Sequence, residues 1–542
     1  MKKKKCIFSG VFSLIISQCI VKIFGLVYKL YLANKQGFGD GGNAIYNSGY
    51  QIYALLLTIS SIGVPNAVSK LIAEKYYRGD KIEILKILKS ALVVFSVIGI
   101  IFSIGLALSA DLISDKLLDI KEAKYSIIAL SPAILNVCLI SVYRGLYNGI
   151  RNVSITAKSQ TIEQILKTIF TIVLVELSFY ITCSNTVIMA ATANFATTLA
   201  TLFSLIYLCR KNNVGDTKVK CETKYAKRIL KISIPISLSA ILASFNKNID
   251  SITVVRFLKD VIGEQNAIIQ YGILSGKIDV LATLPVSFVI AAATTVLPSI
   301  SMFNAQKNHH KIKEILNTYI LFTVLLVLPC SIGMVFFSNQ ILELLFSNTA
   351  GSFLLKISAI SVLFISLEQI INAALQGIGK VLIPTIALTI GVITKIILNI
   401  TLIRIPENIF PLGGVSGACV ATLVCHVVAC TIGWKVLSRK IKLNLSFFKY
   451  ILKPIISSCI MLVSLNYSYF LLKGIITQNI AIILAIIIAG IVYVSSVLML
   501  RILSKDELKM IPILSNFIKK WEKIKKKEGF CTILANNHYS SL

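Results

Sequence analysis

The chain has 542 residues, of which 56% are hydrophobic and 15% are charged, and its formal net charge is +31. A soluble protein carries about 25% charged residues, and the apolar residues here fall in runs of about 20, the length that spans a bilayer. These values exclude an ordinary soluble protein and predict an all-α integral membrane protein. The basic surplus does not lie on a soluble module, so we expect no nucleic acid partner.

Hydropathy predicts about fourteen transmembrane helices. The basic and then apolar start, MKKKKCIFSGVFSLII, resembles a signal peptide, but no small-x-small cleavage site clearly ends it, so we expect an uncleaved first helix. The expected spans are residues 7–33, 44–66, 87–110, 125–149, 154–180, 185–209, 229–255, 268–298, 314–337, 353–377, 381–404, 412–436, 448–472 and 478–502.

Lysine and arginine gather at the N-terminus, in every second loop and in the C-terminal tail. Such residues collect on the cytoplasmic side of membrane proteins, so the pattern predicts both termini in the cytoplasm. The longest basic loop lies near the middle of the first twelve spans and is typical of a linker. The predicted divisions are a six-helix lobe (1–209), a cytoplasmic linker (210–228), a second six-helix lobe (229–437), two additional helices (438–502) and a basic cytoplasmic tail (503–542).

An internal repeat supports two lobes. LIAEKYYRGDKIEIL (71–85) resembles FNAQKNHHKIKEIL (303–316), LYNGIRN (146–152) resembles LQGIGK (375–380), and Lys167 falls opposite Lys395. The displacement of roughly 228–232 residues covers six helices, an even number, which predicts parallel halves related by a pseudo-two-fold axis along the membrane normal. In transporters of this architecture the substrate site lies between the halves.

An ionisable side chain inside a span is a candidate functional residue, because charge is costly in lipid. In the first span Gln18, Lys22, Gly25 and Lys29 form one helical stripe. Snorkelling can explain Lys29, but Lys22 is many residues from either end. We expect a basic stripe that faces a cavity.

Later spans carry further candidates. Glu163 and Lys167 are i,i+4 partners and form either a structural pair or part of a site. Lys395 has no acid at i±4, so it needs an anionic ligand or a partner from another helix, and Asp250 is one candidate. The remaining charged candidates are Lys277, Asp279, Glu368 and Arg144, the last of which lies close to the inner face.

Basic residues outnumber acidic ones in these spans, which indicates an anionic substrate, and the compact charge of lysine suits phosphate. Cys425, His426 and Cys430 suggest a metal cluster but lack a fourth ligand, so we expect no metal. No nucleotide-binding loop or catalytic triad motif occurs, which predicts a protein that is not an enzyme and has no cofactor.

Three segments together resemble a known family: GDGGNAIYNSGYQIYALLLTISSIGVPNAVSKLIAEK, YRGLYNGIRNVSITAKSQTIEQILK and LQGIGKVLIPT. They are similar to the polysaccharide-export branch of the MATE-like multidrug/oligosaccharidyl-lipid/polysaccharide flippase superfamily, in the group of stage V sporulation protein B and the MurJ-type lipid II flippases. The resemblance implies a central cavity with alternating access, a lipid pyrophosphate substrate and no ATP hydrolysis. It also implies that Lys22 and Lys277 line the cavity.

The sequence departs from this family where an acid near the start of helix 2 corresponds to Asn43, and where Lys395 occupies the helix that carries a sodium-site acid in some members. Three functions compete. The first is a flippase for lipid II or another undecaprenyl-pyrophosphate glycan. The second is a multidrug or cation antiporter using Glu163, Asp250 and Glu368, and the third is a membrane enzyme, which would need a large outer loop.

For the favoured flippase we expect a bacterial cytoplasmic membrane location, extending to forespore or mother-cell membranes if the role is in sporulation. The expected partners are membrane lipids, a lipid-linked oligosaccharide with pyrophosphate, and the cell-wall synthesis machinery. Membrane potential, H⁺ or Na⁺ would supply the coupling.

Overall fold

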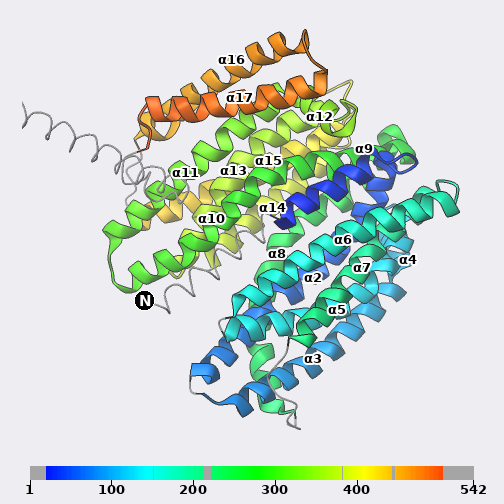
Figure 1. Ribbon diagram of the computed structural model, residues 1–542, viewed down its shortest axis with the longest axis vertical. Coiled ribbons are helices and arrows are strands. Elements are labelled where there is room, and N and C mark those ends of the chain that lie inside the picture. The colour runs from blue at the N-terminus through cyan, green and yellow to red at the C-terminus, as the bar shows by residue number, and fades with distance from the viewer. Residues whose placement is uncertain are drawn as a thin grey trace, which may run out of the picture.

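The computed structural model describes residues 20–77, 79–150, 152–211, 221–380, 382–441 and 446–503, and these ranges are helical almost throughout, without strands (Figure 1). The all-α prediction is therefore confirmed. Lys2 to Lys5, most of the linker and nearly all of the predicted tail lie outside the described residues.

The first helix is described over residues 20–34. The later elements are α2 (Gly39–Tyr77), α3 (Lys81–Leu108), α4 (Ala110–Leu112), the π-helix η1 (Ile113–Leu117), α5 (Ala123–Gly149), α6 (Val153–Ile181), α7 (Thr186–Arg210), α8 (Thr223–Ile262), α9 (Glu264–Ile273), the π-helix η2 (Leu274–Ile278), α10 (Asp279–Ala305), α11 (His309–Phe336), α12 (Ser338–Phe346), α13 (Ser352–Gly377), α14 (Leu382–Leu402), α15 (Gly414–Lys440), the π-helix η3 (Phe448–Leu452), α16 (Lys453–Lys473) and α17 (Gln478–Met499).

Within the described ranges, 12 segments are long and apolar enough to cross a membrane. Several helices extend beyond the predicted spans: α2 begins at Gly39 rather than near residue 44, and α8 begins at Thr223, inside the predicted linker. Hydropathy detects only the apolar centre of a helix, whereas the backbone continues through polar turns at both ends. The helix count of about fourteen stays a prediction.

Local sequence fixes the ends of several helices. The Asn185 side chain accepts hydrogen bonds from the backbone N–H groups of Val187 and Ile188 at the start of α7. Asn308 accepts one from the Lys311 N–H at the start of α11. Asparagine is among the best N-cap residues, because its oxygen satisfies N–H groups that have no partner within the helix.

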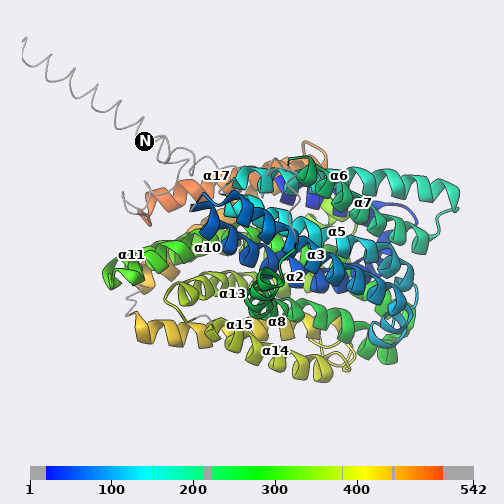
Figure 2. The same cartoon turned by 90° about the horizontal axis from the view of Figure 1, so that it is seen from below.

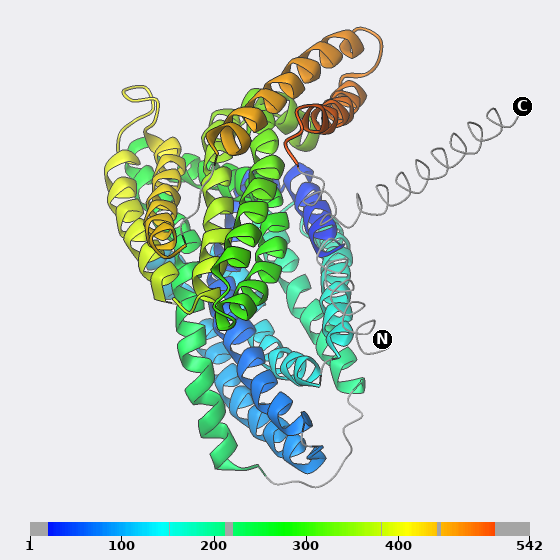
Figure 3. The ribbon, with the colours of Figure 1, turned by 90° about the vertical axis from the view of Figure 1, so that its left-hand side faces the viewer.

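The helices form two bundles (Figure 3). The N-terminal bundle comprises α2, α3, α5, α6 and α7, and the C-terminal bundle comprises α8, α10, α11, α13, α14 and α15; within each, neighbouring helices contact one another. Helix α8 bridges the two, because it packs against α2 and α3 as well as against α14 and α15 (Figure 2). Helices α16 and α17 pair with each other beside α11, far from α3, α5 and α7 (Figure 1).

Candidate functional site

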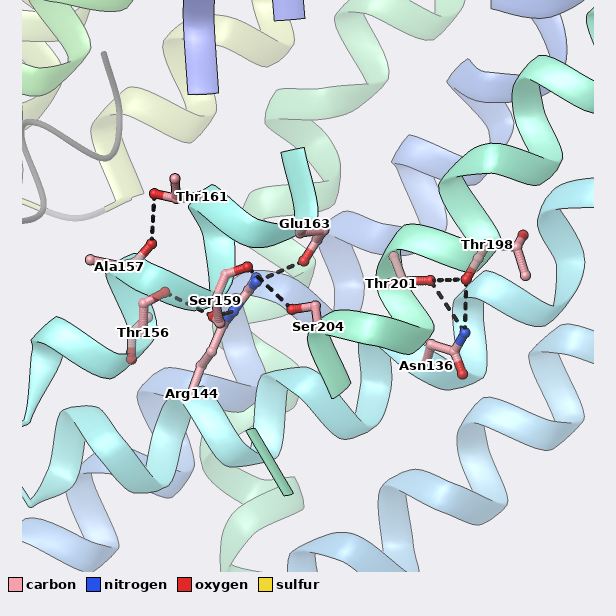
Figure 4. Close-up of polar contacts among 10 residues, drawn as sticks. All are labelled: Asn136, Arg144, Thr156, Ala157, Ser159, Thr161, Glu163, Thr198, Thr201 and Ser204. Atoms are coloured by element: carbon pink, nitrogen blue, oxygen red, sulfur yellow. Dashed lines mark hydrogen bonds and ion pairs between the residues drawn. The ribbon is translucent and has the colours of Figure 1, made fainter. Parts of the chain in front are cut away.

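Among the described residues, charged side chains form ion pairs within the N-terminal bundle, within the C-terminal bundle and between the two. In the N-terminal bundle, Arg144 on α5 reaches α6 (Figure 4). Its Nη2 lies 2.7 Å from Glu163 Oε2, and its Nε donates to Ser159 Oγ at 3.1 Å. Arg144 is therefore part of a structural ion pair inside the bundle rather than only an interfacial anchor.

This contact overturns the predicted pair of Glu163 with Lys167. Glu163 points to the guanidinium of the neighbouring helix, which offers hydrogen-bond donors in a fixed geometry. Lys167 is 4% exposed, and its Nζ lies over two aromatic rings, 4.1 Å from the centroid of Tyr50 and 5.0 Å from that of Tyr28. No carboxylate of the described residues forms an ion pair with Lys167.

The first helix lies against α6. The Thr168 hydroxyl donates to the carbonyl of Phe24 at 3.1 Å, and Gly25 lies beside the amide of Gln164. Lys22 is exposed and Lys29 is half-buried. Gln18, the remaining polar member of the predicted stripe, lies outside the described residues.

The C-terminal bundle contains the contact expected between Asp250 and Lys395. Lys395 on α14 is 1% exposed, and its Nζ lies 2.7 Å from Asp250 Oδ2 on α8. The other carboxylate oxygen accepts a hydrogen bond from Asn399 at 3.2 Å. Of the two alternatives for Lys395, an anionic ligand or a partner from another helix, the structure shows a partner from another helix.

Glu368, on α13, also has a basic partner. Its Oε2 lies 2.6 Å from Nδ1 of His426 on α15, and its Oε1 accepts a hydrogen bond from Asn372 at 3.2 Å. In the sequence, His426 stands out only through its position beside Cys425 and near Cys430, where we expect no metal. Its contact with Glu368, 58 residues away, could not be read from local spacing.

Lys277, on η2, connects the two bundles. Its side chain is 1% exposed, and its Nζ lies 2.8 and 2.9 Å from the two carboxylate oxygens of Asp40 at the start of α2. Lys277 Nζ also donates a hydrogen bond to Asn348 Oδ1 at 3.0 Å. An acid therefore lies near the start of α2 after all, at Asp40, three residues before Asn43. The position of Asp40 in the polar segment GDGGN was the available signal.

Other contacts join the bundles at the same end. Asn34 of the first helix donates to the Leu345 carbonyl at 2.7 Å. Asp119 forms ion pairs with Arg256 at 3.0 Å and Lys259 at 2.9 Å, both on α8. Burial opposes the charged form of Asp119, but its bonds to these two cations outweigh burial and lower the pKa of the carboxyl below its ordinary value. We call the end of the molecule that carries these contacts of Lys277, Asn34 and Asp119 the closed end. The loop charges predict that it faces outside.

Comparisons with known proteins agree with this architecture. The family described as "Polysaccharide biosynthesis protein" matches residues 7–304, and the MatE family matches residues 235–401. The lipid II flippase MurJ of Bacillus subtilis is 26% identical, with 89% of this chain and 93% of that protein covered. Stage V sporulation protein B of the same organism is 24% identical, with 95% and 99% covered.

A solved structure of lipid II flippase MurJ in an inward closed conformation has the same fold, with a TM-score of 0.70 at 19% identity; the match covers 89% of this chain and 97% of that one. The family match covers more than half of the chain. The predicted membership of the MATE-like flippase superfamily is confirmed, and the chain belongs to its polysaccharide biosynthesis protein family.

Proposed function

We propose that the protein is a flippase that moves a lipid-linked anionic glycan, such as an undecaprenyl-pyrophosphate-linked sugar of the lipid II class, from the inner to the outer leaflet. The observation that carries the proposal is Lys167, a buried cation that contacts aromatic rings and pairs with no described carboxylate. A buried charge needs a counter-charge. Lys22 and Lys29 on the adjacent helix add positive charge to the same bundle. An anionic headgroup satisfies this arrangement, while the polyprenyl chain stays in lipid.

The competing antiporter function requires carboxylates that are open to an organic cation. Each of the three candidate acids already has a basic partner: Glu163 contacts Arg144, Asp250 contacts Lys395 and Glu368 contacts His426. A cation would have to displace these partners one by one. The pairing therefore favours an anionic substrate.

The proposed transport cycle is alternating access, in which the closed end opens and closes. Contacts between the bundles, including that of Lys277 with Asp40, close this end in the present arrangement. Separation of the two bundles there would give the opposite state. No ATP is required by this scheme, and membrane potential, H⁺ or Na⁺ remains the proposed source of energy.

The test compares Lys22→Ala with the parent protein. A hydrogen bond to a charged group contributes about 1.5–3 kcal/mol, so lipid II affinity should fall by about tenfold to a hundredfold. Lys22→Ala should fail to complement a flippase-depleted strain at normal membrane abundance, whereas Lys22→Arg should function in part. Lys158→Gln, an exposed position on α6, is the control. A parent protein that binds lipid II no better than uncharged undecaprenol would refute the proposal.

A further inference from the structure

The two bundles share one register, a displacement of 228 residues. Helix α7 begins at Thr186 and α15 begins 228 residues later, at Gly414. Helices α5 and α13 end at the same displacement, at Gly149 and Gly377. A Cβ on either glycine would meet an isoleucine of the helix packed beside it, and these two isoleucines are also 228 residues apart. Positions on α13 and α15 can therefore be compared with their counterparts on α5 and α7.

The register sets Glu368 and His426, which contact each other between α13 and α15, opposite two uncharged residues of the N-terminal bundle, Ile140 and Thr198. Ile140 is fully buried, and the Thr198 hydroxyl donates to a backbone carbonyl of α5 at 2.7 Å. One bundle therefore packs these positions without charge, whereas the other places an acid and a base there. The packing of the fold does not require the two ionisable groups.

The pair of Glu368 and His426 lies deep in the C-terminal bundle. His426 is near the middle of α15 (Gly414–Lys440). The Glu368 side chain is 4% exposed and that of His426 is 12% exposed. A buried ion pair contributes little net stability compared with apolar residues of similar volume. The place of the pair inside a span therefore favours a functional role over a structural one.

Other ionisable groups surround the pair on α13, α15 and the elements packed against them. Two thiols of α15, those of Cys425 and Cys430, lie within electrostatic range of Glu368. Asp250 and Lys395, which bind each other at 2.7 Å, lie within range of the same Cys425 thiol, so both ion pairs of the bundle are near one thiol. The remaining groups are Lys356 on α13, Cys419, Lys435, Arg439 and Lys440 on α15, Asp279 on α10, Lys277 on η2, Glu343 on α12, His309, His310, Lys311, Lys313, Glu314, Tyr319 and Cys330 on α11, and the charged residues near the two ends of α8.

Within this set, His426 is suited to exchange a proton. Histidine is the side chain whose ordinary pKa, about 6.5, lies in the physiological range, and His309 and His310 lie in the first turn of α11 rather than in the middle of a span. Together, Glu368 and His426 are neutral when they hold one proton between them. Loss of that proton leaves a buried carboxylate, and gain of a second leaves a buried cation, and both are costly while the site is closed to water. A change in water access therefore changes how many protons the pair holds.

We infer that Glu368 and His426 form the binding site of a coupling proton, which is taken up and released once in each transport cycle. The inference rests on the proposed function and adds the coupling ion and its site. Helix α15 packs against α8, which bridges the bundles, so motion between the bundles acts on the surroundings of His426. A sodium ion, which binds through oxygen ligands, would have to displace the imidazole from Glu368. The geometry therefore favours a proton.

The decisive variant is Glu368→Ile/His426→Thr, which copies the arrangement of the N-terminal bundle. The variant should fold, because the other bundle packs these two residues at the same positions, and its thermal unfolding midpoint in detergent should not fall. Glu368→Gln/His426→Gln, which keeps polar side chains at both positions, is a second variant without the titrating pair. Asp115→Asn, which removes an exposed carboxylate, is the control.

Lipid II is the probe, in proteoliposomes whose membrane potential is held at zero. An amine-reactive reagent that cannot cross the bilayer measures its distribution between the leaflets. One coupled proton should change the leaflet ratio by about tenfold for each unit of pH difference, since one unit corresponds to about 1.4 kcal/mol. The parent and Asp115→Asn should show this shift, and reversal of the gradient should reverse it. Both pair variants should lose the shift but still equilibrate lipid II at equal pH, because they are uncharged like the pair with its proton.

A shift of parental size in both folded pair variants would overturn the inference. A parent that equilibrates lipid II without responding to the gradient would also overturn it, as would folded pair variants that no longer equilibrate lipid II at equal pH. Each of these results would leave the proposed function standing. A parent protein that does not equilibrate lipid II between the leaflets would instead refute the proposed function.

Discussion

Asp40→Asn should open the closed end of the molecule. The substitution keeps the shape of the side chain but removes the negative charge opposite Lys277, whose Nζ contacts both carboxylate oxygens at 2.8 and 2.9 Å. Lys277 is 1% exposed, so water cannot readily replace the lost partner in the closed arrangement. The contact joins α2 to η2, so its loss selectively destabilises the state in which these elements meet.

The size of the effect follows from the contact. Hydrogen bonds to charged groups contribute about 1.5–3 kcal/mol each, and 1.4 kcal/mol changes an equilibrium constant tenfold. The bond from Asn348 remains in the variant. The ratio of closed to open molecules should therefore fall by about tenfold to a hundredfold.

Cross-linking measures this ratio. Asn34 and Leu345 lie on opposite sides of the closed end, with the amide nitrogen 2.7 Å from the carbonyl oxygen. In a cysteine-free background, Asn34→Cys and Leu345→Cys should react rapidly with a short bismaleimide, and much more slowly when Asp40→Asn is added. Asp115→Asn, which removes an exposed carboxylate 3.9 Å from Lys121 Nζ, is the control. Equal rates with and without Asp40→Asn would refute the reasoning.

Three further predictions concern the C-terminal pair, the orientation and pH. Asp250→Asn should impair transport and lower the free energy of unfolding by about 3–5 kcal/mol, because it leaves Lys395 buried without its carboxylate. Denaturant unfolding should show that the double variant Asp250→Asn/Lys395→Met is more stable than Asp250→Asn alone. Equal stability of Asp250→Asn and the parent would contradict this prediction. Asp115→Cys should be labelled from outside intact cells and Lys218→Cys only after permeabilisation, whereas the opposite result would reverse the predicted orientation. The pKa of Asp119 is lower in the folded protein, so its contribution is present above the ordinary carboxyl pKa of about 3.9 and is lost as the pH falls through the lower folded value. Denaturant unfolding should therefore show a free energy of unfolding that falls more steeply over that acid range in the parent than in Asp119→Asn.

The sequence predicts the C-terminal pair because a strong physical constraint applies there. A lysine in the middle of an apolar helix without an acid one turn away needs a partner from elsewhere. Few acids occur in the other spans, so Asp250 was a natural candidate for Lys395. The fold class and the parallel repeat are predicted on other grounds, from the apolar runs and from the matching segments of the two halves.

The errors arose where several partners were available. Glu163 had Lys167 at i+4, but Arg144 from the neighbouring helix reaches it instead, and local spacing cannot rank a partner within a helix against one across helices. Asp40 was missed because it lies before the apolar part of α2, outside the predicted span of 44–66. The ends of spanning helices are polar, and hydropathy says little about which of their charges meet across the molecule.

The three lysines that are buried among the described residues differ in the source of their counter-charge. Asp250 and Lys395 both belong to the C-terminal bundle, so their pair survives any rigid motion between the bundles. Asp40 and Lys277 lie on opposite sides of the junction, so the same motion separates them and leaves Lys277 in need of an anion. Under the proposed function the substrate supplies the negative charge for Lys167. Opening of the closed end would then expose Lys277 on the side toward which the anion is carried. Closing would pair Lys277 with Asp40 again. Under the proposed function, Asp40 would therefore compete with the substrate for Lys277 and favour release of the anion as the end closes.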